Sequence, residues 1–211
     1  MSAKSSYLTN KLIDWFWRGQ TFAPPATLYF GLLTTTNGLR SNSTAYALNN
    51  TISVVANDGK THLYKCTTAG TTAAAQSTLY PGVANEVIVD GTATFTEQNS
   101  ALKSNTGLVE VSGTGYARVG VVASLTNFAG TQAAASTTVS TGTNGTTSNN
   151  GTITFGSPTS TWGNVWAIAV FDASTAGNLL EWGGLSASKT INNGDAAPSI
   201  AISAFTSQED N

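Results

Sequence analysis

An all-β fold is what this sequence of 211 residues predicts: a jelly-roll-like β-sandwich with one N-terminal helix and a small inserted β-domain. Short runs rich in β-branched and aromatic residues recur along the chain, and glycine-rich turns separate them. Only one segment has the spacing of an amphipathic helix. Short strands at such regular spacing are typical of sandwiches and barrels.

The composition predicts how the surface behaves. Only 9% of the residues are charged, whereas 21 are glycine and 34 are threonine. A free monomer usually depends on surface charge to stay dispersed, and a typical soluble domain is roughly a quarter charged. We therefore expect the chain to pack against copies of itself. Five Trp, six Tyr and eight Phe can still build a substantial core.

The helix is expected at residues 6–18. Its apolar positions recur at i, i+4, i+7 and i+8 and form one stripe, Leu8, Leu12, Trp15 and Phe16. Ser5 or Ser6 can cap its start, and Gly19 can end it. Two interpretations are open: the helix covers one end of the β-core, or it is an arm that docks on another subunit.

Two discontinuous segments, 1–38 and 99–211, are expected to form the sandwich domain. Its strand candidates are 27–34, 108–112, 116–124, 152–155, 165–172, 179–185 and 199–205. Between them, residues 129–151 consist almost entirely of Ala, Ser, Thr, Gly and Asn, which indicates a long loop or a weak exposed hairpin.

Three tryptophans gather in the last third of the chain. Alternation in strand 165–172 places Trp166, Ile168 and Val170 on one face, and residues 165, 167, 169 and 171 on the other. Both faces are apolar, which indicates burial on two sides and makes Trp166 a core residue. Trp162 and Trp182 lie near strand ends, where an exposed indole can stack on a sugar or fill a subunit contact.

Residues 39–98 differ in character and are expected to form the inserted β-module. Its strand candidates are 51–56, 61–67, 86–89 and 92–96. Asp58-Gly59 and Asp90-Gly91 lie between them, and Asp-Gly pairs favour tight hairpin turns.

The sequence offers few groups for chemistry, and we predict no catalytic, cofactor-binding or metal-binding residue. His62 is the only histidine, which excludes a site built from several histidines of one chain, and it is expected to be a solvent-exposed strand residue. Cys66 is the only cysteine and is expected to be buried as a small hydrophobe. The eleven carboxylates are scattered. No basic cluster indicates nucleic-acid binding, and no apolar run is long enough for membrane insertion.

Four segments of the sandwich domain are distinctive in combination: TLYFGLLT at 27–34, EVSGTGYAR at 110–118, WGNVWAIAVFD at 162–172 and GNLLEWG at 177–183. In this order they resemble a family of tailed-bacteriophage virion proteins. Such proteins are often described as tail-fibre or minor structural proteins. The resemblance implies a non-enzymatic β-module at the virion surface, made in the host cytoplasm.

The insert contains three further distinctive segments, TAY at 44–46, LYKCTTAGTT at 63–72 and DGTATF at 90–95. Together they resemble small β-modules of the chitin- and cellulose-binding type, although Phe95 stands where such modules commonly have Trp. Tyr46, Tyr64 and Tyr80 are then the candidates for glycan contact. The alternative is that these three rings pack the core of a very small domain, which needs every aromatic residue that it has.

These observations leave three functional hypotheses. The first is a capsid decoration protein, because the sequence has no coiled coil or repeat from which to build a shaft. It would bind itself, as a homotrimer, and other virion proteins such as the major capsid protein. The second is a tail-fibre or receptor-binding protein whose insert holds a host-surface glycan. The third is a glycan hydrolase, which would need a carboxylate pair that the sequence does not single out.

Overall fold

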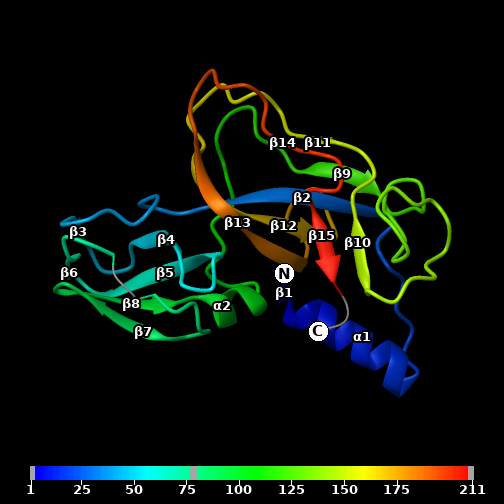
Figure 1. Ribbon diagram of the computed structural model, residues 1–211, viewed down its shortest axis with the longest axis horizontal. Helices are drawn as coiled ribbons and strands as arrows, with labels where there is room; N and C mark the ends of the chain where they lie inside the picture. Colours follow the sequence, from blue (N-terminus) through cyan, green and yellow to red (C-terminus); the bar gives the residue numbers. More distant parts are fainter. Residues whose placement is uncertain (1–2, 77–79, 209–211) are drawn as a thin grey trace.

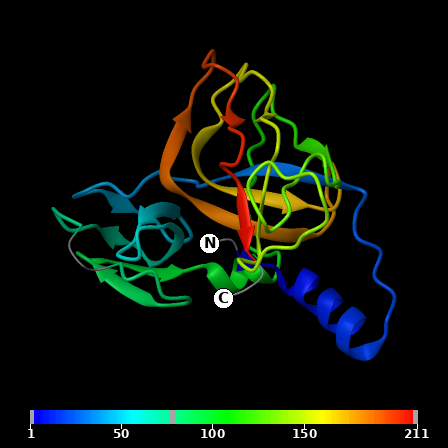
Figure 2. The ribbon, with the colours of Figure 1, turned by 45° about the vertical axis from the view of Figure 1, so that its right-hand side comes forward.

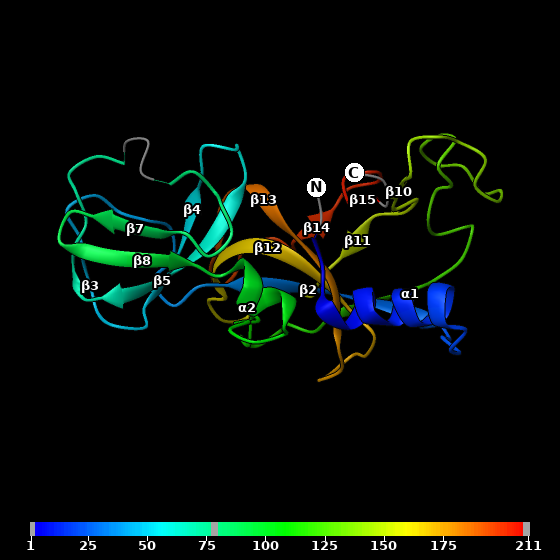
Figure 3. The same ribbon diagram turned by 90° about the horizontal axis from the view of Figure 1, so that it is seen from below.

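The computed structural model describes residues 3–76 and 80–208, and within them the all-β class is confirmed. The described part contains two helices, α1 (Ser6–Arg18) and α2 (Asn99–Lys103). Antiparallel sheets make up the rest of the regular secondary structure (Figure 1). The inserted sheet and α1 lie at opposite ends of the molecule, as the view from below also shows (Figure 3).

A five-stranded main sheet forms the centre of the molecule. Its strand order is β1 (Ala3–Lys4), β13 (Leu179–Ile191), β12 (Gly163–Phe171), β2 (Thr27–Thr34) and β9 (Val119–Val122), and every neighbouring pair is antiparallel. The central strand, β12, is apolar and buried on both faces, as the sequence predicts, and so is the second half of its neighbour β2. Each face therefore packs against another layer.

One face of the main sheet is covered by two short strand pairs and the loops around them. The pairs are β10 (Thr146–Ser148) with β15 (Thr206–Gln208) and β11 (Ile153–Thr154) with β14 (Ser199–Ile200). The hydrophobic core between these layers includes Phe30, Val170, Leu180, Ile153 and Ile200. These two layers give the sandwich arrangement that the sequence predicts.

The insert forms a sheet of its own. Its strand order is β4 (Thr51–Val55), β5 (Thr61–Thr68), β8 (Ala93–Glu97) and β7 (Val87–Asp90), with a small pair of β3 (Ala45–Tyr46) and β6 (Gly70–Thr71) beside it. A separate hydrophobic cluster fills it. The strand positions agree with the sequence within two residues. The division of the chain into two domains stays a prediction.

The second face of the main sheet is covered by the insert and by α2. Leu63 of β5 and Leu102 of α2 pack in one cluster with Trp166, Trp182 and Phe171 of the main sheet. Strand β5 contacts both β12 and β13. This contact fixes the position of the insert beside the sheet.

A β-bulge at Trp166 corrects one expectation. On β2, Val165 pairs with Thr34 and Ala167 pairs with Leu33, so Trp166 is an extra residue between them. An extra residue shifts the alternation of side chains. Trp166 therefore lies on the insert-facing side with Ala167, whereas Val165 lies on the opposite side. The expected grouping of Trp166 with Ile168 and Val170 is wrong for this reason.

Four strand candidates of the sandwich domain are shorter than expected, and two of them, 116–124 and 152–155, form only the shorter strands β9 and β11. Segment 108–112 contributes only an isolated bridge between Glu110 and Leu33. The final alternating segment forms β14 and then turns. The side chain of Asn149 stabilises this turn, because it donates to the carbonyl of Ala201 at 2.8 Å and accepts from the amide of Phe205 at 3.0 Å. The expected loop, 129–151, contains no strand over residues 129–145, but strand β10 lies within it and pairs with the distant β15.

Candidate functional site

Helix α1 presents an aromatic face that no other segment covers among residues 3–76 and 80–208. Its first turn is anchored, because the Ser5 hydroxyl accepts from the amide of Leu8 at 3.1 Å and Tyr7 and Leu8 pack against the core. The helix then runs away from the body (Figure 2). Its outer half leaves four large apolar side chains exposed: Ile13 by 45%, Trp15 by 53%, Phe16 by 68% and Trp17 by 77%.

These four side chains and Leu12 are called the aromatic face below; together they line a shallow apolar pocket. The rings of Phe16 and Trp17 meet edge to face, with centroids 4.9 Å apart. Of the predicted stripe, Leu12, Trp15 and Phe16 belong to this face, whereas Leu8 turns to the core. Sequence reasoning missed Ile13 and Trp17, because they fall outside the i, i+4 spacing of the stripe.

The three tyrosines proposed for glycan contact are in the core of the insert. Tyr46 is 4% exposed, and Tyr64 and Tyr80 are fully buried. Tyr64 and Tyr80 pack edge to face at 4.8 Å. Their hydroxyls donate to carboxylates, that of Tyr64 to Glu86 and that of Tyr80 to Asp90. Since core side chains surround these rings, their positions agree with the packing alternative and leave no ring face for a sugar.

Trp162 and Trp182 are also buried, each 4% exposed. Trp162 donates its indole N–H to the carbonyl of Thr114 at 3.1 Å, and the loop before Tyr116 covers it. Trp182 pairs with Ala169 in the middle of the sheet and lies under the insert. Neither indole is exposed, because segments distant in the sequence cover both side chains.

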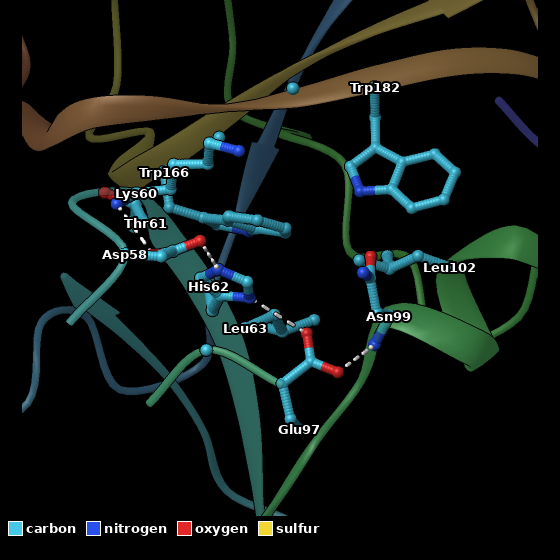
Figure 4. Close-up of a pocket in the computed structure, with 13 residues that line it drawn as sticks. Asp58, Lys60, Thr61, His62, Leu63, Glu97, Asn99, Leu102, Trp166 and Trp182 are labelled. Carbon is cyan, nitrogen blue, oxygen red and sulfur yellow. Dashed lines mark hydrogen bonds and ion pairs between the residues drawn. The ribbon is translucent and has the colours of Figure 1, made fainter. Parts of the chain in front are cut away.

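A pocket of about 250 Å³ lies where the insert meets the main sheet, and we call it the junction pocket (Figure 4). Residues from the insert, from α2 and from β12 and β13 line it. They are Asp58, Lys60, Thr61, His62, Leu63, Gly82, Glu97, Asn99, Leu102, Trp166, Trp182, Gly183 and Gly184. Trp166 lies next to His62, and Trp182 lies near Leu102 on the other side (Figure 4).

His62 is held between two carboxylates at the wall of this pocket. Its Nδ1 lies 3.1 Å from Glu97 Oε1, and its Nε2 lies 3.1 Å from Asp58 Oδ2. The side chain of His62 is only 12% exposed, so the expectation that it is a solvent-exposed strand residue is wrong. Strand β8 and the turn before β5 bring the two carboxylates to it, and the sequence gives no local sign of the Glu97 contact.

The charges of this cluster support one another. Burial opposes the charged form of His62, but hydrogen bonds to Glu97 and Asp58 outweigh it and hold the pKa of His62 above its ordinary value. Burial likewise opposes ionisation of Asp58, but hydrogen bonds from Lys60 and His62 hold the pKa of this carboxyl below its usual range. Both ring nitrogens of His62 are engaged, so the imidazole has no lone pair free to act as a base on a substrate.

Two buried polar atoms at the junction pocket have no hydrogen-bond partner in the described part of the chain. They are the hydroxyl oxygen of Thr61 and the indole nitrogen of Trp166. Thr61 is 3% exposed and Trp166 is 2% exposed. An unpartnered buried polar group is costly and uncommon in native proteins.

The single cysteine has a structural role. Cys66 lies in the insert core, as the sequence predicts, and its thiol donates to the carbonyl of Thr68 at 3.2 Å. Burial raises the pKa of this thiol, which disfavours the reactive thiolate. Residues 3–76 and 80–208 contain no cluster of three His, Cys, Asp or Glu side chains that could bind a metal ion. In the same residues no helix is long and apolar enough to span a membrane.

The fold and these surfaces define a β-protein whose most exposed feature is an aromatic helix face. Residues 3–102 and 92–208 both match the family described as Podophage GP4 fiber I protein gp80. Together these segments cover nearly the whole chain, and the chain belongs to this family. It is therefore a structural protein of a phage virion. No curated protein matches the chain.

Proposed function

We propose that this protein is a non-enzymatic subunit of a phage fibre and that it assembles with copies of itself through the aromatic face of α1. The exposed aromatic face is the observation that carries this proposal. The family description favours a fibre over capsid decoration. Capsid decoration and contact with the major capsid protein stay predictions.

The size of the aromatic face supports an assembly role. A buried aromatic side chain covers 150–250 Å², so the exposed parts of Trp15, Phe16 and Trp17 amount to about 400 Å² per copy. The largest apolar patch on a soluble monomer is typically about 300–600 Å², and such a patch is often a functional contact surface. Stable interfaces bury about 800 Å² on each partner. Two aromatic faces in contact supply about half of that area.

The charges on α1 lie away from this face. Arg18 pairs with Asp14 at 2.7 Å, and the ammonium of Lys11 lies 5.7 Å from the centroid of the Tyr7 ring. A helix that faces solvent would carry such charges on its outer side. Because only 9% of the chain is charged, little repulsion opposes contact between copies.

A second copy is the occupant that best fits these facts. Homo-oligomers are the commonest soluble assemblies, and a fibre places copies of its subunit side by side. The homotrimer that the sequence predicts would bring three aromatic faces together around one axis. Host-glycan binding through Tyr46, Tyr64 and Tyr80 is not part of this proposal, because these rings are buried.

Light scattering after size-exclusion chromatography tests the assembly. We expect the wild-type chain to form an oligomer and the double variant Phe16→Ser/Trp17→Ser to be a folded monomer by circular dichroism. The matched control is Val87→Ser/Val89→Ser on β7, which removes side chains exposed by 64% and 63% at the other end of the molecule. A wild-type monomer, or an oligomer that the α1 variant leaves intact, would contradict the proposed interface.

Antibody labelling of intact particles tests the location separately. We expect label on fibres, at few positions per particle. Label spread evenly over the shell would favour the capsid decoration hypothesis instead.

A further inference from the structure

We propose that the N-terminal arm of one copy docks on strand β13 of a neighbouring copy in the assembled fibre, in exchange for that neighbour's own arm. The arm is residues 3–18, which contain β1 and α1. This inference deepens the fibre proposal and rests on it, because the arm also carries the aromatic face. It names the surface that each copy offers to the next, which is the edge of β13 that β1 occupies.

The arm is seated on the body only at its beginning. Strand β1 adds to the edge of β13, with Lys4 opposite Glu181. The amide of Ser5 then donates to the carbonyl of Leu180 at 2.9 Å. The first turn of α1 packs against the core, but no residue of the helix is buried. Because these contacts are confined to one edge of the sheet, a second copy of the chain offers an identical seat.

The linker that joins the arm to β2, residues 19–26, makes few contacts with the body. It has no buried residue, and residues 21–25 make no hydrogen bond within the described part of the chain. It runs outside the body from the outer end of α1 to β2 (Figure 2). Pro24 and Pro25 favour an extended backbone, and a linker of this length reaches about 28 Å when fully extended. The seat is therefore the main contact that holds the arm on its own body.

Exchange of arms keeps the contacts of the seat and gives the aromatic face a place. Each copy supplies the same β13, so the pairing with β1 is preserved, and swapping of identical elements is a low-cost route to oligomers. The linker joins the outer end of α1 to its own body, so an arm that is seated on a neighbour lies between two bodies. The aromatic face is on that outer half, where the arm of the next copy can cover it. In the closed arrangement the same face stays exposed.

A disulfide across the seat shows which chain supplies the arm. Lys4→Cys/Glu181→Cys places two thiols on opposite residues of an antiparallel pair, whose Cα atoms are about 5 Å apart and within reach of a disulfide. The full chain also carries Cys66→Ala, which removes its own thiol. After oxidation of the oligomer, we expect most chains to run as covalent dimers or trimers on a denaturing gel without reductant. A closed arm gives a disulfide within one chain and a monomer band.

The matched control moves the second thiol along the same strand. Lys4→Cys/Lys189→Cys carries an exposed cysteine on β13 beyond the seat, and it should give no defined covalent oligomer. Circular dichroism checks that each variant folds. If Glu181→Cys does not fold, a photo-crosslinking p-benzoylphenylalanine in place of Lys4 leaves Glu181 intact and repeats the test. Irradiation should then join different chains.

The same disulfide in Phe16→Ser/Trp17→Ser separates the exchange from the aromatic interface. Exchange costs translational freedom, which the aromatic contacts offset, so we expect this variant to close its arm and give a monomer band. An interchain disulfide that persists in it would support the exchange and contradict the aromatic interface. An intrachain disulfide in a wild-type background that light scattering shows to be an oligomer would overturn the exchange alone. An intrachain disulfide in a monomer would overturn both.

Discussion

Arg118 holds the carboxylate of Glu110 through two parallel hydrogen bonds, from Nε to Oε1 at 2.9 Å and from Nη2 to Oε2 at 2.7 Å. Its Nη1 donates to the carbonyls of Ala173 and Ala176, both at 2.8 Å. Tyr116 donates to the same carboxylate at 2.6 Å. The two ends of segment 110–118 are thus fixed to each other and to the turn after β12. Bidentate arginine–carboxylate pairs of this kind are among the strongest ionic contacts in proteins.

Glu110→Ala should lower the free energy of unfolding by about 3 kcal/mol, because it leaves a largely buried guanidinium without its counter-charge. The matched control is Asp14→Ala, which removes the exposed Arg18–Asp14 pair and should cost less than about 0.5 kcal/mol. Chemical denaturation of both variants measures the difference. Equal costs would show that the Glu110 pair is no stronger than a surface contact.

A second pair, Arg40 with Asp90, is almost completely buried in the insert. Arg40 donates Nε to Oδ2 at 2.7 Å and Nη2 to Oδ1 at 3.0 Å, and the two side chains are 1% and 0% exposed. Asp90 also accepts from the Tyr80 hydroxyl and from the amide of Ala73. Burial opposes the charged carboxylate, but these hydrogen bonds hold the pKa of Asp90 below its usual range.

Arg40→Met should lower the free energy of unfolding by about 3 to 5 kcal/mol, because it leaves the buried carboxylate of Asp90 without a counter-charge. Asp90→Asn should lower it by a similar amount, because it leaves the buried guanidinium of Arg40 without a counter-charge. The double variant should cost less than the two single variants together, since it leaves neither charge unpaired. Denaturant unfolding of the four proteins gives the coupling energy. A coupling of zero would show that the two charges do not stabilise each other.

Local signals explain how much of this fold the sequence predicts. A serine cap and a terminal glycine are short-range features, and they mark α1 to the residue, with Ser5 before it and Gly19 after it. The Asp-Gly pairs likewise locate two hairpin turns of the insert. Both features act through the backbone of neighbouring residues, so the sequence alone reveals them.

The junction pocket depends on distant contacts and could not be predicted in this way. Trp166 stands out in the sequence, but its orientation depends on a bulge that strand pairing creates. Glu97 is 35 residues from His62 in the chain, and only the β5–β8 pairing brings it near. Alternation assumes a regular strand, and it fails at an extra residue.

The His62 cluster predicts how stability depends on pH. Since the pKa of folded His62 lies above the ordinary value of 6.5, the folded state binds the proton more tightly than the unfolded state. The stabilisation is fully present below the unfolded pKa and is lost as pH rises through the folded pKa. The free energy of unfolding should therefore fall as pH rises from about 6 to 8, a range below the ordinary pKa of Cys.

The variant His62→Gln isolates this effect. It cannot titrate, so its stability should change less over the same range. Urea denaturation of both proteins at several pH values measures the two slopes. A wild-type stability that rises with pH, or a variant with the same slope, would exclude His62 as the group responsible.

Gly91 and Gly59 make a matched pair of hairpin turns for the last prediction. Both have left-handed backbones, with φ of +67° and +76°. A Cβ added at Gly59 has nothing within 4 Å, whereas one at Gly91 would lie 2.2 Å from the carbonyl oxygen of Thr71. Gly59→Ala should lower the free energy of unfolding by about 1 kcal/mol, which is the strain of placing a residue with a Cβ in the left-handed conformation. Gly91→Ala should cost at least about 3 kcal/mol, because β6 must also move away. Thermal unfolding of the two variants measures the difference, and similar melting temperatures would mean that the approach of β6 to this turn does not constrain the insert.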